Sequence, residues 1–330
     1  MIRIITDSTS SLPKDLREKL GIHLLNLVVN RGGVSHVEGE MDLDAFYADI
    51  YEMADDIPTS SQPSALSIEA ALEEAAGDEV LGIFISGRMS GTFEGVARAA
   101  RETTKRHPDF KYALIDSMTN CMELGWAVVA ACEARDAGGS LEECVEAATR
   151  AMSSTRFIFA PESLKFLEKG GRIGKASALL GNMLNISPIL TVKNGEAATF
   201  SKVRTQKKAL AKMVDVFKRD VENHGLRNVA VHYIGSRSCV RVGTRCDRSL
   251  GGEDRDGASC KPRDRRACGS CYGACLRMRC ADRRQVRNFA RDHCFVVALT
   301  PVPQDSFGAN LCVRSLSAFR GDCCLLTIPS

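Results

Sequence analysis

Charge of one sign and long apolar runs are both scarce in this sequence of 330 residues. Lys and Arg number 44 and Asp and Glu number 41, which leaves a formal net charge of only +3. So small an excess gives no reason to expect nucleic acid as a partner, although a transient contact with a membrane surface stays open. No apolar run reaches the roughly 20 residues that a membrane-spanning helix needs. The N-terminus meets Asp7 too early for a secretory signal, and we therefore expect a cytoplasmic protein.

Cysteine is also scarce in the first part of the chain, but not in the last. Only Cys121, Cys132 and Cys144 precede Ser236, whereas the other eleven of the 14 cysteines follow it. Basic residues change at the same place, with 13 Lys and 14 Arg up to that point and 1 Lys and 16 Arg after it. A single protein rarely changes its lysine usage so abruptly, which sets residues 237–330 apart from the rest of the chain.

Buried strands and helices alternate along the first part of the chain. Short apolar runs rich in β-branched residues predict strands, and the stretches between them predict helices. Such strand-loop-helix repeats predict a parallel sheet covered on both faces, in an N-terminal α/β domain of residues 1–155. The expected strands are Ile2–Thr6, Ile22–Val29, Val80–Ile85 and Tyr112–Ile115, and the expected helices include Leu12–Leu20, Asp42–Met53, Ala65–Ala76 and Thr92–Arg106.

A second α/β unit is expected over residues 156–236. An Asn194-Gly195 pair between two strand-like runs is the strongest local signal for a tight hairpin in this unit. A long amphipathic helix and one more strand follow the hairpin. The expected elements are the strands Ile186–Val192, Ala197–Val203 and Asn228–Tyr233 and the helix Thr205–His224.

One polar loop favours an anionic ligand. Ligands of parallel α/β sheets bind at the carboxyl ends of the strands, where Asp7–Ser10, Ser86–Gly91 and Asp116–Thr119 are expected to lie. The loop Ser86–Thr92 adds small residues and a helix N-terminus, whose free N–H groups and positive partial charge suit an anion. It lacks the Gly-Lys-Ser/Thr ending of a Walker A loop.

Three further motifs have a structural interpretation beside a functional one. The hydroxyls within the loop Ile57–Ser64 could donate to a carboxylate or phosphate, or Ser64 could simply cap the next helix. Arg172, after two glycines that end a helix, could pair with an anion or lie in solvent. Ser187–Leu190 is best interpreted as the entrance to a strand. No motif decides the function by itself.

Taken in order, these motifs resemble the DegV family. They comprise Asp-Ser-Thr after the first strand, a Ser-Ser-Gln-Pro-Ser loop, a Ser-Gly-Thr loop, a Lys-Gly-Gly-Arg-Ile turn, and a Pro-Ile-Leu strand before an Arg-Thr helix, over roughly two-thirds of the chain. The resemblance implies a two-domain α/β fold that encloses one long-chain fatty acid and needs no cofactor. It also implies a carrier rather than an enzyme. Such a carrier presents the carboxylate to a separate fatty acid kinase catalytic subunit, which makes an acyl-phosphate for phospholipid synthesis.

The same resemblance assigns the residues of the site. Relatives usually have threonine where Ser60 stands, a change that keeps the hydroxyl. Met89 replaces a usual leucine, and Gly87 stands where a serine is frequent, so one hydroxyl is missing. The implied carboxylate-binding residues are Ser60, Ser61, Ser90, Gly91 and Thr92, and the implied head-group-neutralising residues are Arg172 and Arg204.

The residues before Ser236 offer little to an enzyme. They contain no Ser/His/Asp grouping, no metal-ligand cluster and no paired acids, so we expect neither a catalytic residue nor a metal. The alternative from the enzyme class is a small-molecule kinase or hydrolase that uses the Ser86–Thr92 loop for phosphate. A carrier also agrees with energetics, since each buried CH₂ of an acyl chain contributes about 0.8 kcal/mol.

Residues 237–330 allow two interpretations. Cys268, Cys271, Cys275 and Cys280 have the short spacing of a zinc or iron–sulfur module. The other interpretation is a frameshift, which would make the thiol cluster accidental. The DNA sequence of the gene around codon 237 distinguishes the two.

The genetic code supports the frameshift hypothesis. Suitable codons for Cys260–Cys275, read one nucleotide later, give Ala-Ser-Pro-Val-Ile-Gly-Val-His-Val-Gly-Pro-Ala-Met-Gly-Pro. This peptide resembles the closing segment of DegV proteins. We therefore predict that residues 237–330 are an out-of-frame, poorly structured tail. The second α/β domain is then truncated or scrambled at its C-terminal end.

Overall fold

A four-stranded parallel sheet forms the centre of the N-terminal half. The computed structural model describes residues 1–48, 56–182, 186–232, 295–300 and 323–327. The sheet has the order β2-β1-β6-β7, and every neighbouring pair is parallel, as the strand-loop-helix pattern predicted. Its strands are β1 (Ile2–Asp7), β2 (His23–Leu25), β6 (Glu79–Phe84) and β7 (Lys111–Asp116).

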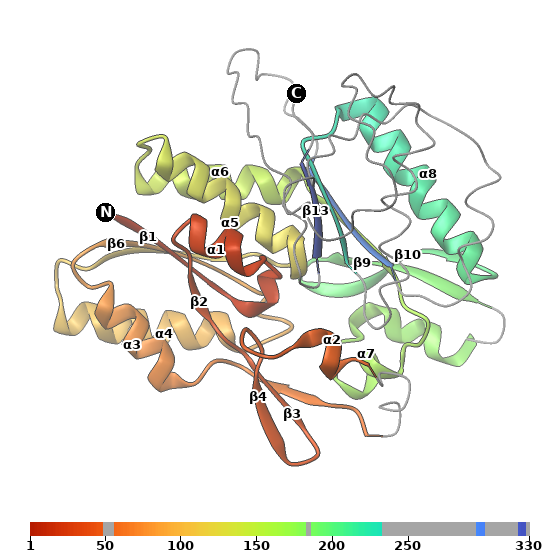
Figure 1. Cartoon of the computed structure of the whole chain (residues 1–330), viewed down its shortest axis with the longest axis horizontal. Coiled ribbons are helices and arrows are strands. Elements are labelled where there is room, and N and C mark those ends of the chain that lie inside the picture. The colour runs from red at the N-terminus through yellow and green to blue at the C-terminus, as the bar shows by residue number, and fades with distance from the viewer. Residues whose placement is uncertain (49–55, 183–185, 233–294, 301–322, 328–330) are drawn as a thin grey trace, which may run out of the picture.

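Helices cover both faces of this sheet (Figure 1). Successive residues of each strand point to opposite faces, so Ile4 packs toward one layer and Ile5 toward the other. The sheet is therefore the middle layer of three, and its polar loops are left at the ends of the strands. The first layer contains α1 (Lys14–Lys19), α5 (Cys121–Asp136) and α6 (Leu141–Ser154), and the second contains α3 (Ala65–Glu74) and α4 (Thr92–Arg106).

A small antiparallel sheet, β4-β3-β5, extends from this half. Thr59–Ser61 forms β5, which pairs with β3, so the expectation of a loop over these residues was wrong. The predicted cap is present, since Ser64 Oγ accepts from the Ser67 N–H at 3.0 Å. The helix expected from Asp42 is observed only as the short α2, and residues 49–55 lie outside the described part. The elements here are β3 (Val28–Arg31), β4 (Val34–Val37) and α2 (Leu43–Phe46).

The second half is built on an antiparallel sheet of six strands, in the order β10-β9-β8-β12-β11-β13. Helix α8 (Gln206–His224) covers one face, and α5 and the 3₁₀ segment η3 (Gly174–Asn182) lie on the other. The predicted hairpin is confirmed, with Asn194 and Gly195 both at positive φ in its turn. The strands are β8 (Arg156–Ala160), β9 (Ser187–Lys193), β10 (Glu196–Val203), β11 (Asn228–His232), β12 (Phe295–Thr300) and β13 (Cys323–Thr327).

Two of these strands come from the tail that was expected to be poorly structured. β12 pairs with β8 and β11, and β13 pairs with β11, while the rest of residues 237–330 lies outside the described part of the chain. Short apolar runs can complete a sheet whose neighbouring strands leave hydrogen-bonding groups unpaired. The cysteine cluster at residues 268–280 lies outside the described residues.

One hydrophobic core runs through the junction of the two halves. The cluster around α5 includes Ile83 and Ile115 from the first sheet and Phe157, Phe159 and Val192 from the second. Because the halves share this core, loops at the end of the first sheet face the second sheet directly. The junction is therefore the place where the site must be sought.

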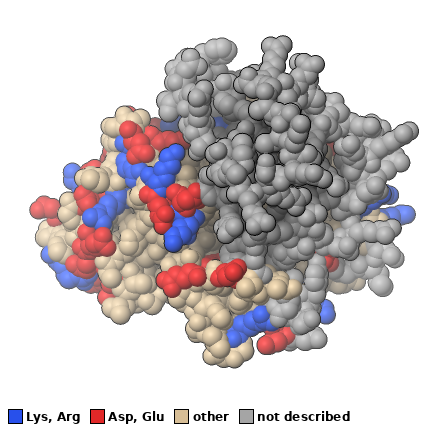
Figure 2. Space-filling view, viewed as in Figure 1, with Lys and Arg blue, Asp and Glu red and all other residues tan. Residues whose placement is uncertain are grey.

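The described part of the face seen in Figure 2 shows no large patch of one charge. Basic and acidic side chains lie side by side over the N-terminal half in that view. Among the described helices, none combines the length and apolar character that a crossing of the bilayer requires.

Candidate functional site

The loop Ser86–Thr92 lies where β6 passes into α4, at the carboxyl end of the parallel sheet. Ser90 Oγ and Thr92 Oγ1 are 2.8 Å apart, and Ser90 Oγ also accepts from the Thr92 N–H at 3.3 Å. Gly91 is the N-cap residue and offers no side-chain hydrogen bond to the helix. The two hydroxyls thus lie beside the first turn of α4, whose N–H groups and dipole favour a negative charge.

Asp7 holds the base of this loop. Its carboxylate is completely buried and accepts from the backbone N–H of Ile85 at 2.8 Å and from that of Thr9 at 2.9 Å. Burial raises the pKa of Asp7, while the hydrogen bonds from Thr9 and Ile85 oppose that rise. Through this one side chain the loop after β1 fixes the position of the loop after β6.

The hydroxyl-bearing strand β5 lies next to the Ser86–Thr92 loop. A Cβ atom built on Gly91 would lie only 2.3 Å from Gln62 Oε1, so the loop and the segment after β5 are in close contact there. Ser60 and Ser61 immediately precede Gln62 and are exposed. The structure thus brings the predicted Ser-Ser-Gln motif to the predicted Ser-Gly-Thr motif, with Gln62 as the residue between them.

Arg172 contacts the same loop from the second half. Its Nε donates to the carbonyl oxygen of Met89 at 3.2 Å, and its guanidinium also donates to the carbonyl of Gly170. Gly171 has a φ of +73°, which only glycine adopts readily and which turns the chain toward the loop. Arg172 and Ser90, 82 residues apart in sequence, are therefore neighbours in space.

The β9–β10 hairpin closes the loop from another side. Ser86 Oγ, which is buried, donates to the carbonyl oxygen of Gly195 at 2.9 Å, and Arg88 forms an ion pair with Glu196. Gly195 is essential to this contact, since a Cβ atom there would lie 2.5 Å from Ser86 Oγ. Sequence reasoning found the turn but gave no signal that its tip lies on the loop.

Arg204 is not brought to the other predicted residues. β10 begins at Glu196 beside the loop and ends at Val203. At about 3.3 Å per residue, Arg204 lies roughly 25 Å along the strand from the hairpin. No hydrogen bond or ion pair between described residues joins Arg204 to the loop.

An apolar region begins at the loop. Met89 packs on the core of the junction, and Phe159 belongs both to that core and to a second cluster under η3. This second cluster includes Ile173, the residue that follows Arg172. The hydroxyls of the Ser86–Thr92 loop and the guanidinium of Arg172 therefore lie at one end of a continuous apolar region. Its buried members in the second cluster are Leu164, Ala176, Leu179 and Leu190.

The described residues near the loop do not form a catalytic arrangement. The hydrogen-bonding partner of Ser90 is Thr92 and that of Ser86 is a carbonyl oxygen, so neither serine has a base beside it. Burial raises the pKa of Cys121 and Cys132 to about 12, which keeps both thiols protonated. Over the described ranges, no group of three or more His, Cys, Asp or Glu side chains could hold a metal ion.

Glu123 is a half-buried acid beneath the site. It accepts from Thr119 Oγ1, and the carbonyl of Thr119 accepts from the Ser86 N–H at 2.9 Å. Burial raises the pKa of Glu123 to about 7, against the hydrogen bond from Thr119 and the charge of Arg156. Sequence reasoning missed this residue because nothing local distinguishes it from an ordinary acid in the first turn of a helix.

The raised pKa of Glu123 predicts a pH-dependent stability. The folded protein holds this proton between about pH 4.5 and pH 7, whereas the unfolded chain releases it. The free energy of unfolding should therefore be highest at the acid end and fall as the pH rises through that window. The loss assigned to Glu123 is on the order of 2–3 kcal/mol.

Denaturant unfolding at several pH values measures this effect. The difference between the wild-type protein and Glu123→Gln isolates Glu123 from other acids such as the buried Asp7, and that difference should change across the window. Glu142→Gln, an exposed acid in the first turn of α6, serves as the control and should change little. Parallel curves for the wild type and Glu123→Gln would refute the assignment.

The fold and this site define the class of protein. A parallel-sheet half and an antiparallel-sheet half meet at a hydroxyl-rich, anion-favouring loop that borders a shared apolar core. The chain belongs to the DegV family, as its motifs indicated: the model of that family of uncharacterised proteins matches residues 1–242. The match ends close to the point where lysine usage changes.

Individual relatives agree with the family assignment. The chain is 42% identical over 235 residues to a DegV domain-containing protein of Clostridium acetobutylicum, which covers 71% of this chain and 82% of the relative. Among solved structures, it is similar to a fatty-acid-binding DegV family protein of Thermus thermophilus, with a TM-score of 0.70 and 26% identity over 91% of this chain and 99% of the other. A stearic acid-binding protein of Eubacterium ventriosum has a TM-score of 0.62 and 26% identity over 71% of this chain and 82% of the other.

Proposed function

We propose that this protein binds one long-chain fatty acid between its two halves. The carboxylate binds at the Ser86–Thr92 loop, and the acyl chain lies in the apolar region beyond Arg172. The contact of Arg172 with Met89, at the edge of that region, is the observation on which the proposal depends. The similar proteins from Thermus thermophilus and Eubacterium ventriosum, which bind fatty acids, support it.

The chemistry of the loop suits a carboxylate. Ser90 and Thr92 supply hydroxyl donors beside a helix N-terminus, and Ser60 and Ser61 lie on the neighbouring strand. Each hydrogen bond to an ionised carboxylate is worth roughly 1.5–3 kcal/mol. Arg172 adds a positive charge beside the loop. The carboxylate and the acyl chain of the ligand thus both contribute to the binding free energy.

The protein acts as a carrier subunit and not as an enzyme. It presents the bound carboxylate to a separate kinase, which forms an acyl-phosphate in the cytoplasm. Two features support this role: the exposed side of the loop at Gly91 leaves the head group reachable, and no base lies beside Ser90 or Ser86 within the described residues. The family resemblance alone supports a role for Arg204 in neutralising the head group.

Solvent extraction of the purified full-length chain, followed by mass spectrometry, tests the binding. We expect about one long-chain fatty acid per protein chain, because burial of an acyl chain at about 0.8 kcal/mol per CH₂ makes its loss during purification slow. The delipidated protein should take up an added fatty acid again. A chain that neither carries nor takes up a fatty acid would overturn the proposal.

A second assay tests the carrier role. The loaded protein is incubated with ATP, with and without a fatty acid kinase catalytic subunit, and acyl-phosphate is trapped with hydroxylamine. Product should form only when the kinase is present. Formation of acyl-phosphate by the isolated protein would instead favour the small-molecule kinase alternative.

A further inference from the structure

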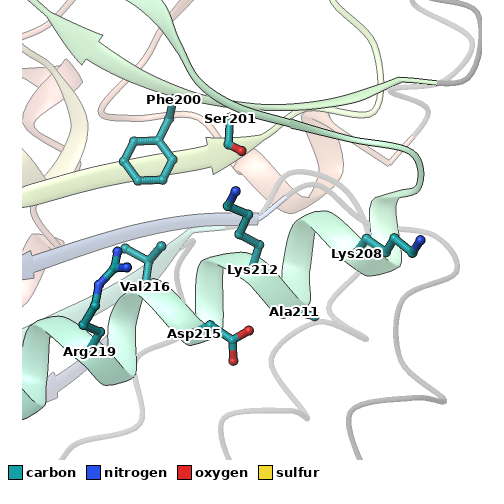
Figure 3. A pocket seen from close by; sticks show the side chains of 8 residues that line it. All are labelled: Phe200, Ser201, Lys208, Ala211, Lys212, Asp215, Val216 and Arg219. Atoms are coloured by element: carbon teal, nitrogen blue, oxygen red, sulfur yellow. The ribbon is translucent and has the colours of Figure 1, made fainter.

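The hollow between β10 and α8 is an ordinary feature of the surface (Figure 3). Its cations Lys212 and Arg219 are exposed, while Phe200 and Val216 pack in the core under α8. Nothing in this arrangement points to a ligand. The edge of the small sheet β4-β3-β5 carries a stronger signal.

Strand β4 lies at one edge of this sheet, in a hairpin that projects from the lower side of the molecule in Figure 1. Among the described strands it pairs only with β3, in a register without shifts. The two-residue turn Gly32-Gly33 makes Arg31 and Val34 a hydrogen-bonded pair, and such pairs alternate along an antiparallel ladder. The backbone N–H and C=O groups of Ser35 and Val37 therefore point away from β3.

β4 has few of the features that protect a sheet edge. Its sequence Val-Ser-His-Val contains no lysine, no acid and no proline, and its ladder contains no bulge. Val34 and Val37 are 56% and 37% exposed, and they are two of the five large apolar side chains that are exposed in the described part of the chain. An edge of this kind is a template for a further strand. Its four residues, about 13 Å, restrict that strand to a short segment.

The charge around this edge is acidic. From Gly32 to Ser64 the sequence contains eight Asp and Glu residues and no Lys or Arg. Glu40 and Asp42, which follow the strand, are exposed. The nearest cation in the sequence, Arg31, is turned onto α2, where its guanidinium lies 5.7 Å from the ring centre of Phe46. A second copy of this chain or an anionic membrane would meet like charge here, whereas a basic segment would be attracted.

Both edges of the small sheet are joined to the Ser86–Thr92 loop. Gln62, which follows β5, contacts that loop directly. Glu38, which follows β4, accepts from Ser8 Oγ at 2.5 Å, and Ser8 is next to Asp7, whose carboxylate holds the base of the loop. A segment bound at β4 would therefore lie on an element that borders the anion-favouring loop.

We propose that the outer edge of β4 is a docking site for an extended, basic segment of a partner protein, which adds a strand to the sheet. Hydrogen bonds to the backbone of Ser35 and Val37 hold the segment in place. Its apolar side chains cover Val34 and Val37, and its Lys or Arg side chains face Glu40 and Asp42. A short segment in which basic and apolar residues alternate satisfies all of these contacts. The site does not depend on the binding of a fatty acid.

Fluorescence anisotropy of a labelled peptide, Lys-Val-Lys-Val-Lys-Val, with the full-length protein tests this site. We expect the peptide to bind and Glu-Val-Glu-Val-Glu-Val not to bind. Ser35→Pro should weaken binding roughly tenfold or more, since proline removes the outward N–H of residue 35 and leaves the ladder to β3 intact. Ser35→Ala is the matched control. It also loses the bond from the Ser35 hydroxyl to Asn30 Oδ1 but keeps the N–H, and it should change the affinity less than about twofold.

Hydrogen exchange followed by mass spectrometry locates the bound peptide, which should slow exchange at residues 34–37. No binding, or binding that Ser35→Pro leaves unchanged, would overturn the proposal. Equally tight binding of Lys-Lys-Lys-Val-Val-Val would show only attraction between opposite charges. A dimer of this protein that Ser35→Pro abolishes would instead assign the edge to a second copy of the chain. Circular dichroism of each variant establishes that the fold is intact before affinities are compared.

Discussion

Replacing Ser90 by alanine is expected to weaken the binding of a long-chain fatty acid by roughly ten- to a hundredfold. Ser90 Oγ lies 2.8 Å from Thr92 Oγ1 at the N-terminus of α4, and so it can donate to a carboxylate that the helix dipole also attracts. The loss of one charge-assisted hydrogen bond accounts for the magnitude. Titration of the delipidated protein with the fatty acid, followed by calorimetry, measures it.

The matching fatty alcohol separates the head group from the tail. It has the same acyl chain but no carboxylate, so Ser90→Ala should bind it almost as well as the wild-type protein does. Ser153→Ala is the control for removal of a hydroxyl, since Ser153 is exposed near the end of α6 and bonds only within its own helix. The assignment of Ser90 fails if the variant keeps the wild-type affinity for the acid, or if it loses the acid and the alcohol equally.

The features that could be predicted from sequence are those that depend on neighbouring residues. The Asn194-Gly195 turn is one: a two-residue hairpin of type I′ requires positive φ at both positions, and the observed values are +55° and +80°. The cap at Ser64 is another, since the hydroxyl bonds an N–H only three residues away. The parallel sheet followed from the same kind of local pattern, repeated along the chain.

The features that escaped prediction depend on residues far apart. Thr59–Ser61 has the composition of a loop, and it becomes a strand only because β3 offers a paired edge. The strands at residues 295–300 and 323–327 complete a sheet whose other members lie at least 60 residues earlier. Whether such a segment forms a strand depends on the strands beside it in the sheet. These partners are distant in sequence, so the residues around the segment do not reveal them.

The candidate site shows the same division. Hydroxyl-rich loops after strands predicted that Ser90 and Thr92 would lie at the carboxyl edge of the sheet, and the structure places them there. The contact of Arg172 with Met89 joins residues 83 positions apart, and only the family resemblance suggested it. Glu123 and the tip of the hairpin carried no signal at all, because burial and approach are properties of the folded chain.

The hairpin contact leads to the second large effect that we expect: Gly195→Ala should abolish stable retention of the fatty acid. Gly195 has a φ of +80°, and a Cβ atom there would lie 2.5 Å from Ser86 Oγ and 3.1 Å from the methyl carbon of Met118. The turn must then move away from the loop. That movement breaks the hydrogen bond from Ser86 to the Gly195 carbonyl and opens the junction at the head group.

Gly33→Ala is the matched control for the backbone strain. Gly33 lies in the β3–β4 hairpin with a φ of +77°, but a Cβ atom there meets nothing within 4 Å. Both variants should lose about 1 kcal/mol of unfolding free energy from the unfavourable φ. Only Gly195→Ala should release the fatty acid faster, as followed by transfer of a fluorescent fatty acid to lipid vesicles. Because the two substitutions share the strain and differ in the contact, equal release rates would mean that the hairpin does not hold the ligand in place.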